Sequence, residues 1–569
     1  MKIYLALGPM PKNASPAAFF ASGPWCFSGQ EKDFENWEET YTFAPEPLAN
    51  QNVLPKACKM AQALSLKIIP LIVSELGEKF NGYPNPYWET LLIPWAISFA
   101  SQITERYLRV NAMIEIWGNK QLVANLLPEN TIFNFQNEAD FNLRGLLGIN
   151  YNWWLFSRLL EKNPPLNWQL DYEKSLSPIS FGQVQRKTIF ADIRHFLKKL
   201  LLKMPFPRLK GMSFFQSLTF SAALLHGCKN PDSPLSIFNE FNNPELIRDL
   251  CNENFLLTLI RTSLPESIKL LTHPKKWARS HKSQKIKIAS ITAYEDCVYR
   301  QALAIWKANG NRLAWVQHGG NYGQIKVACN AAMVEYAEDV FFTWGWNKQE
   351  DLIGNFVPMP YPQLQNIRNH WQQKSDVIIF AGTEMACFSY RLESRPTPLQ
   401  FIAYRNAKKI FLDNCSSVLR KRILYRPYFT LPGLLEDGPW ITARFPEVKI
   451  CKGQLLPQML QCSLLILDHH GTTMLEGFAA NIPMILYWDP AAWPLSQECV
   501  YLLKELHKHE IWHPDPESAA QKLREIANDP QKWWLSSSIQ KCVKEYCKFQ
   551  AWTLKSGIDY YWWKTLSNL

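Results

Sequence analysis

The residues best suited to chemistry follow a short apolar run in the C-terminal third of the chain. Residues 464–467 are all apolar and have the length of a buried strand, and the turn from Asp468 to Thr473 follows them directly. Residues 474–480 carry apolar side chains at helical spacing, before a second apolar run at 482–488. Two strands joined by so short a helix form one parallel βαβ unit, with its turn at the carboxyl edge of the sheet. Because the first N–H groups of that helix have no partner inside it, we expect a phosphate to bind there.

Five residues of this turn and helix are candidates for binding a phosphorylated donor. Gly471 lets a ligand approach the backbone, and the hydroxyls of Thr472 and Thr473 can reach phosphate oxygens. His470 stands beside them, and Glu476 falls in the first helical turn, where its carboxylate can accept hydrogen bonds from ribose hydroxyls. A simpler interpretation stays open, in which a threonine only caps the helix and Glu476 only favours the helix dipole.

A second candidate turn, Gln317 to Gly323, also follows a short apolar strand. Three glycines within it allow backbone amides to approach an anion, so Gly319 and Gly320 join the predicted donor-binding residues. His318 stands at the strand end, where it could donate to a phosphate or transfer a proton; the alternative is a structural histidine. The glycine spacing is not that of the dinucleotide fingerprint. We expect an activated sugar to lie in a groove between this turn and the turn at 468–473.

Two further strand ends belong to the predicted donor site. Gly382 and Thr383 follow the apolar run at 377–381, and Arg426 ends the run at 423–426. An arginine in this position could hold a phosphate or carboxylate through two parallel hydrogen bonds. A surface arginine held by a nearby carboxylate is the alternative for Arg426.

Carboxylates expected near the turn at 317–323 are candidates for the general base. Glu295 and Asp296 follow the strand expected at 286–291, and a sugar hydroxyl that acts as nucleophile needs a base within hydrogen-bond reach. Capping of the next helix by Asp296 is the competing interpretation. Glu138 and Asp140 are alternative bases with weaker positional support. No Asp-x-Asp pair stands in an exposed loop beside a strand, so we expect a metal-independent reaction.

These residues require an α/β scaffold, and from residue 286 onward short apolar runs alternate with helices as in a doubly wound fold. The strands expected there are 286–291, 313–317, 340–343, 377–381, 423–426, 448–451, 464–467 and 482–487. Before residue 286 we expect strands at 3–7 and 131–135 and helices at 87–110 and 152–160.

The expected architecture is α/β, with two Rossmann-type domains facing a central cleft. We assign residues 1–365 to an N-terminal, acceptor-side domain, 366–515 to a nucleotide-sugar-binding domain, and 516–569 to a helical tail. The N-terminal domain carries a basic helical insertion at about 181–285. Between Arg186 and Lys210 basic side chains alternate with apolar ones, which fits either an anionic membrane surface or the solvated face of a core helix.

Composition restricts the partners. The net charge of +11 favours anionic ones, such as nucleotide phosphates, acidic saccharides or lipid headgroups, and no nucleic-acid-binding motif accompanies it. The 13 cysteines form no C-x-x-C pair and no zinc-like set, so we expect free thiols in a reducing compartment. Neither a signal peptide nor a spanning segment stands out. We therefore expect a cytoplasmic protein, and a peripheral position on the inner face of the cytoplasmic membrane is a further possibility.

Four motifs occur in an order that resembles a known family. They are Trp25-Cys26, Tyr87-Trp88 with Pro94-Trp95, Gln317 to Gly323, and Asp468 to Pro483. The set is similar to transferases of bacterial surface-carbohydrate biosynthesis loci, and its C-terminal motif resembles the donor-binding helix of GT-B glycosyltransferases. The Arg426-Pro427 strand end also resembles that of Kdo and polyol-phosphate transferases, although Tyr428 stands where those relatives often have His.

This resemblance implies a GT-B glycosyltransferase in surface-polysaccharide assembly. On that analogy Arg426, Thr472, Thr473 and Glu476 hold the donor nucleotide, with a CMP-sugar favoured and a saccharide or glycolipid as acceptor. The nucleotide sugar is a substrate, and no cofactor is expected. A polyol-phosphate transferase or a nucleotide-sugar epimerase on the same fold is an alternative. A protein that is not an enzyme, a non-catalytic scaffold at a membrane surface, is a further alternative.

Overall fold

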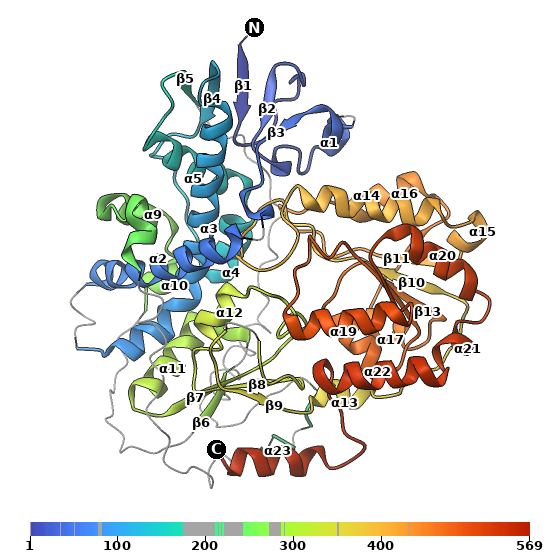
Figure 1. Cartoon of the computed structure of the whole chain (residues 1–569). Helices are drawn as coiled ribbons and strands as arrows, with labels where there is room; N and C mark the ends of the chain where they lie inside the picture. The colour runs from blue at the N-terminus through green and yellow to red at the C-terminus, as the bar shows by residue number, and fades with distance from the viewer. Residues whose placement is uncertain are drawn as a thin grey trace, which may run out of the picture.

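The computed structural model is a mixed α/β protein built on three parallel sheets (Figure 1). The residues that it describes are 2–34, 36–50, 52–77, 82–173, 211–213, 216, 217, 219, 220, 243–271, 286–289, 291–349, 352–431 and 433–569. The predicted α/β class is confirmed. The basic segment from Arg186 to Lys210 lies outside the described residues, so its predicted role stays a prediction.

The N-terminal part of the chain forms a sheet of its own, which the sequence did not predict. Its five parallel strands run in the order β3-β2-β1-β4-β5. The strands are β1 (Ile3–Ala6), β2 (Phe19–Ala21), β3 (Thr42–Phe43), β4 (Leu122–Leu126) and β5 (Trp168–Tyr172). Among these only β1 was predicted, and the strand expected at 131–135 is a loop. Helix α5 (Ile149–Glu161) packs against β4 of this sheet, α3 (Asn85–Trp117) packs against α5, and α2 (Val53–Leu76) packs against α3 (Figure 1).

The other two sheets contain the eight strands that the sequence predicted after residue 286, with ends shifted by two residues at most, and two more, β9 and β15, that it did not predict. The four-stranded sheet has the order β6-β7-β8-β9 and the six-stranded sheet the order β12-β11-β10-β13-β14-β15. The strands of the first are β6 (Ile286–Ala289), β7 (Arg312–Val316), β8 (Val340–Thr343) and β9 (Phe356–Pro358). Those of the second are β10 (Ile378–Ala381), β11 (Ile423–Arg426), β12 (Lys449–Ile450), β13 (Leu464–Leu467), β14 (Met484–Tyr487) and β15 (Trp512–His513).

The helices around these two sheets also follow the predicted alternation. Helices α11 (Cys297–Ala308) and α12 (Cys329–Val334) belong to the four-stranded sheet, and α11 packs against α3. The C-terminal half contains α13 (Pro362–Ile367), α14 (Gln400–Asp413), α16 (Asp437–Arg444), α17 (Leu455–Met459), α18 (Thr472–Ala480), α19 (Gln497–Lys508), α20 (Pro516–Ile526), α21 (Pro530–Trp534), α22 (Ser537–Gln550) and α23 (Ile558–Ser567). The turns that follow β7 and β13 meet, so the two sheets face each other at these carboxyl ends, as the sequence led us to expect.

The four-stranded and six-stranded sheets share one apolar core. Successive residues of a strand point to opposite faces, so Ala314 and Val316 of β7 face the same cluster as Leu465 and Leu467 of β13. The tail joins this cluster through the buried Trp562 of α23. The boundaries at 365/366 and 515/516 stay predictions, but apolar packing is continuous across both of them.

One described helix, α2, is long and apolar enough to cross a membrane on length and composition alone. More than half of its most apolar window is buried within the protein, at 56 %. A buried core helix passes the same test, so this finding carries no conclusion about membranes. The described cysteines are free thiols.

The neighbouring tryptophans of α23 provide a test of the shared core. Trp562 is fully buried, its ring centroid lies 5.3 Å from that of Phe342, and its Nε1–H donates to the carbonyl of Pro360 at 2.8 Å. Trp563 is 43 % exposed. We expect Trp562→Ala to destabilise the protein by about 3–5 kcal/mol, because it leaves a cavity between the sheet and the tail. Trp563→Ala should change stability by less than about 0.5 kcal/mol. Thermal unfolding of both variants measures this, and similar losses in the two would show that the tail is not part of the core.

Candidate functional site

The two predicted turns touch each other directly. The backbone N–H of Gly320, after β7, donates to Oγ1 of Thr472, the first residue of α18, at 2.7 Å. An added Cβ at Gly320 would overlap the backbone of Gly471 and Thr472. Gly471 itself has a φ of 147°, which side-chain-bearing residues rarely adopt. Glycine is therefore required on both sides of this contact, for space at Gly320 and for backbone conformation at Gly471.

This contact corrects one expectation from the sequence. We expected a sugar between the two turns, but Gly320 and Gly471 are buried against each other and leave no space for one. Beside the contact, His318 and Gly319 on one turn and Thr472 and Thr473 on the other remain partly exposed. A ligand therefore has to lie next to the contact, over these four residues.

Helix α18 begins with an available hydroxyl. Thr472 uses its Oγ1 to accept from Gly320, whereas the hydroxyl of Thr473 makes no hydrogen bond to any residue that the structure describes. At nine residues, α18 is long enough to present unpaired N–H groups at its start. The helix start can therefore still receive an anion, as predicted, through Thr473 and the first backbone amides.

His318 belongs to a chain of hydrogen bonds that ends at a buried carboxylate. Its Nε2 lies in a short contact with the hydroxyl of Tyr322, and this hydroxyl donates to Oε1 of Glu335 at 2.8 Å. The hydroxyl of Tyr294 donates to the same oxygen at 2.8 Å. The side chain of Glu335 is 1 % exposed, and that of His318 is 29 % exposed. The chain thus leads from a partly exposed imidazole to a carboxylate inside the protein.

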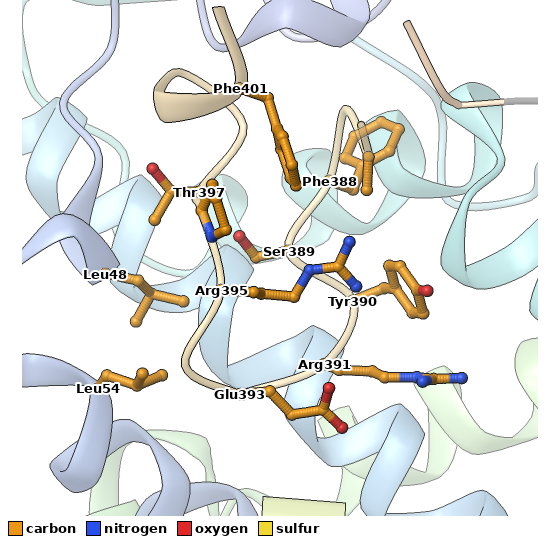
Figure 2. A pocket seen from close by; sticks show the side chains of 12 residues that line it. Leu48, Leu54, Phe388, Ser389, Tyr390, Arg391, Glu393, Arg395, Thr397 and Phe401 are labelled. Atoms are coloured by element: carbon orange, nitrogen blue, oxygen red, sulfur yellow. The ribbon is translucent and has the colours of Figure 1, made fainter. Parts of the chain in front are cut away.

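The loop after β10 brings two arginines toward this side of the molecule. Arg395 pairs with Glu384 at 3.1 Å, and both Arg395 and Arg391 lie near the ring of Tyr390, at 5.6 and 5.2 Å from its centroid. Figure 2 shows the side chain of Arg395 extending toward Tyr390. Both arginines are among the residues that line a pocket of about 20 Å³. Burial alone would raise the pKa of Glu384, but Arg395 and Arg391 hold that pKa below its usual range.

Arg391 remains available for a ligand. Its side chain is exposed and forms no hydrogen bond or ion pair with any described residue. Its charge acts on the hydroxyl of Tyr294, which binds Glu335, so it lies near the buried end of the His318 chain. Interactions with Tyr390 first, and with the carboxylates of Glu393 and Glu384, outweigh burial and raise the pKa of Arg391, so it stays charged.

A buried charge cluster supports the donor side. Nζ of Lys408 lies 2.7 Å from Oδ2 of Asp437 and 3.5 Å from Oδ2 of Asp468, with all three side chains buried. Tyr404 donates to Asp468 at 2.5 Å and accepts from the backbone N–H of Thr383 at 3.1 Å. Burial would raise the pKa of Asp468, but Lys408, His469 and Tyr404 outweigh burial and lower it. The charged carboxylate therefore fixes the start of the turn after β13.

The other residues predicted to bind the donor, on the strand ends and in α18, differ in their exposure and hydrogen-bond partners. Gly382 and Thr383 are partly exposed above this cluster, and an added Cβ at Gly382 would overlap the hydroxyl of Tyr425. Arg426 donates to the carbonyls of Cys451 and Gly453, at 3.1 and 2.8 Å, so its guanidinium holds the next loop through carbonyls, not a carboxylate. The carboxylate of Glu476 accepts from Gln363 of α13.

His470 is placed in the core, which corrects its assignment to the donor site. Its side chain is buried between Trp488 and Trp493, with ring centroids at 5.8 and 4.9 Å, and its Nδ1 lies 3.2 Å from Oε1 of Gln324. Burial, with a smaller effect of His469, lowers the pKa of His470 to about 3. It is therefore a neutral link between the turn and the rest of the core.

Three of the four carboxylates predicted as general bases already have partners in the structure. Oδ1 of Asp296 accepts from the N–H groups of Val298 and Tyr299, so Asp296 caps α11, as the competing interpretation proposed. Glu295 is exposed next to it. Glu138 is buried and paired with Arg300, and Asp140 is paired with Arg144. Among the described residues no three His, Cys, Asp or Glu side chains gather as a metal site.

Sequence reasoning missed the residues that surround His318. Tyr322 lies inside the predicted turn, and its spacing of four from His318 was an unused signal. The arginines follow the predicted β10, in a loop where strand-end residues were already expected to be functional. Glu335 follows the short helix α12 and carries no motif, so nothing in the sequence distinguished it from a surface carboxylate.

Comparison with known proteins identifies a family. The model described as LIC12162 family transferase matches residues 3–566. No curated protein sequence matches the chain. Among solved structures, a mutant of the O-GlcNAc transferase from Thermobaculum terrenum is similar at 10 % identity, covering 91 % of this chain and 99 % of that one, with a TM-score of 0.27. A likeness of that degree carries no argument about the reaction.

Gly319 and Gly320, which are neighbours in the turn after β7, allow a matched test of the contact between the two turns. Gly320→Ala should force the turns apart and destabilise the protein by about 1–3 kcal/mol, because the added methyl overlaps backbone that cannot move easily. Gly319→Ala should cost less, since its Cβ would meet only Oγ1 of Thr472, at 3.1 Å. Thermal unfolding compares the variants. Equal melting temperatures would contradict the tight contact at Gly320.

His470 predicts a pH dependence of stability. Its folded-state pKa, about 3, lies below the unfolded value near 6.5, so the unfolded chain binds a proton that the folded chain does not. The stability from this neutral histidine is complete above about pH 6.5 and falls by up to about 1.4 kcal/mol per pH unit below it. His470→Gln should flatten the fall in melting temperature between pH 7.5 and 4.5. The same substitution at the exposed His370 is the control, and parallel curves for wild type and His470→Gln would refute the prediction.

Proposed function

Because the chain belongs to the LIC12162 family of transferases, we propose that it moves a sugar from a nucleotide-activated donor to a saccharide or glycolipid acceptor. Membership of this family makes the chain an enzyme, in place of the non-catalytic scaffold considered from the sequence. The observation that carries the proposal is the start of α18, which lies beside His318 where the two sheets meet.

The donor phosphate binds at the start of α18 in this proposal. The hydroxyl of Thr473 and the unpaired amides of the first helical turn supply hydrogen bonds, and the helix dipole adds positive charge. Arg391 forms no hydrogen bond or ion pair with a described residue, so in this proposal it takes the role that the sequence gave to Arg426, whose guanidinium is bound to two backbone carbonyls. These groups balance the phosphate charge without a metal ion. A CMP-sugar is the favoured donor.

The acceptor lies on the side of His318. Its hydroxyl loses a proton to the imidazole while its oxygen forms a bond to the anomeric carbon. The bond from that carbon to the phosphate oxygen breaks, and the electron pair leaves with the nucleotide. Separate walls for the donor and the acceptor allow both substrates to be held together, which lowers the entropic part of the barrier.

The alternatives differ in their products. A glycosyltransferase forms a glycosidic bond, a polyol-phosphate transferase forms a phosphodiester, and an epimerase returns an inverted sugar on the same nucleotide. Incubation with a labelled donor, followed by mass spectrometry, separates the three outcomes. A donor made in the cytoplasm and a glycolipid acceptor would place the protein on the cytoplasmic side of the membrane, as expected from the sequence.

Donor binding provides the direct test of this proposal. CMP-, CDP-, UDP- and GDP-linked sugars are compared by thermal shift, and the one that stabilises the wild type is then titrated. Thr473→Val should weaken its binding about tenfold, because a hydrogen bond to a charged phosphate is lost with little change in shape. Thr90→Val is the matched control, since Thr90 lies on α3 with its hydroxyl bound to the carbonyl of Pro86. Unchanged affinity in Thr473→Val would remove the start of α18 from the donor site.

A further inference from the structure

Glu335 is a buried carboxylate that the proposed reaction has not yet used. Its side chain is 1 % exposed, and Oε1 accepts from the hydroxyls of Tyr294 and Tyr322. Its other oxygen, Oε2, has no hydrogen-bond partner among the described residues. No arginine or lysine pairs with it in the described part of the chain. A buried charge with so few partners is costly to keep, so its position next to His318 needs an explanation.

The hydrogen bonds define which nitrogen of His318 carries the proton. The Tyr322 hydroxyl has one hydrogen, and it points to Oε1 of Glu335 at 2.8 Å. Its short contact with Nε2 of His318 therefore requires Nε2–H as the donor. Burial and the charge of Glu335 raise the pKa of Tyr322 well above its usual value, so this hydroxyl keeps its hydrogen. In the neutral imidazole, Nδ1 of His318 then carries the free lone pair, and it has no hydrogen-bond partner among the described residues.

We propose that Glu335 acts through Tyr322 to hold His318 as a general base whose accepting atom is Nδ1. This rests on the proposed glycosyl transfer. Tyr322 and Glu335 are positioning residues, because neither touches the substrate, and His318 is the group that meets the acceptor hydroxyl.

The proton and the charge balance in this step. The acceptor hydroxyl gives its proton to Nδ1, its oxygen forms the glycosidic bond, and the nucleotide leaves with the electron pair of the broken bond. His318 becomes an imidazolium with hydrogens on both nitrogens. Its new positive charge lies 3.7 Å from Oε1 of Glu335, measured from Nε2, with the Tyr322 hydroxyl bridging the two groups. No hydrogen has to move along the chain.

The arrangement favours the transition state over the resting enzyme. In the proposed resting state the imidazole is neutral, and among the described residues Glu335 accepts hydrogen bonds from two tyrosine hydroxyls and has no paired arginine or lysine. As positive charge develops on the imidazole, it interacts with a carboxylate that is shielded from water, where electrostatic interactions are strong. An interaction that strengthens only as the proton moves lowers the barrier without tightening substrate binding.

Two tyrosines bound to the same carboxylate oxygen allow a matched test. Tyr322→Phe breaks the link to His318 and keeps the ring, which stacks on Phe341 with centroids 5.5 Å apart. Tyr294→Phe also removes one hydrogen bond from Glu335 but leaves the link to His318 intact. We expect Tyr322→Phe to lower kcat by about 10- to 100-fold with KM little changed, and Tyr294→Phe to lower it by a few-fold at most. Melting temperatures of both variants show whether the fold is kept.

The tautomer of His318 is measured without any substrate. In protein labelled with 15N-histidine, the ring nitrogen shifts report which atom carries hydrogen, and the signals of His318 are assigned by their loss in His318→Asn. We expect the neutral ring to carry its hydrogen on Nε2 in the wild type and in Tyr294→Phe, and to lose this preference in Tyr322→Phe. The positioning role of Glu335 and Tyr322 would be refuted by an Nδ1–H ring in the wild type. It would also be refuted if wild type and Tyr322→Phe had the same tautomer and the same turnover. If no donor is turned over, the proposed function fails, but the tautomer of His318 still tests the positioning role.

Discussion

The structure depends on a single close contact, in which the backbone of Gly320 lies against that of Gly471 and the Gly320 N–H binds the hydroxyl of Thr472. It joins the carboxyl edge of the four-stranded sheet to that of the six-stranded sheet. It positions the two turns of the site, because His318 lies two residues before Gly320 and α18 begins one residue after Gly471. Both turns follow buried strands, so their registers are fixed by the sheets behind them.

Charge is distributed differently on the two sides of this contact. On the donor side, Lys408 lies between Asp437 and Asp468, so a buried cation balances the carboxylates below the turn. On the acceptor side, Glu335 accepts hydrogen bonds from tyrosine hydroxyls and forms no ion pair with an arginine or lysine among the described residues. The first arrangement is a paired cluster that holds a loop in place. The second leaves a buried carboxylate without a directly paired arginine or lysine next to an imidazole, which suits a group that gains positive charge during a reaction.

The sequence predicted the parts of this fold that have a strong local pattern. The strands at 340–343, 423–426 and 464–467 have the bounds expected, because each is a short, mostly apolar run that ends at a turn. The N-terminal sheet was missed, since β2 and β3 are only three and two residues long and β4 contains the polar Asn125. At the site, the glycine-rich turns and His318 were found from spacing. The core position of His470 was not predictable, because the residues that surround it, Trp488, Trp493 and Gln324, all lie far from His470 in the sequence.

The common core of the two sheets limits how substrates can enter. In a protein whose two halves have separate cores, hinge rotation opens a cleft at little cost. Here Val316 and Leu467 face one apolar cluster and Trp562 closes it from the tail, so rotating one sheet away from the other would expose that surface to water. Admission of the proposed nucleotide-sugar donor then requires local rearrangement in surface segments, such as the loop after β10 that carries Arg391 and Arg395, around a scaffold that stays rigid.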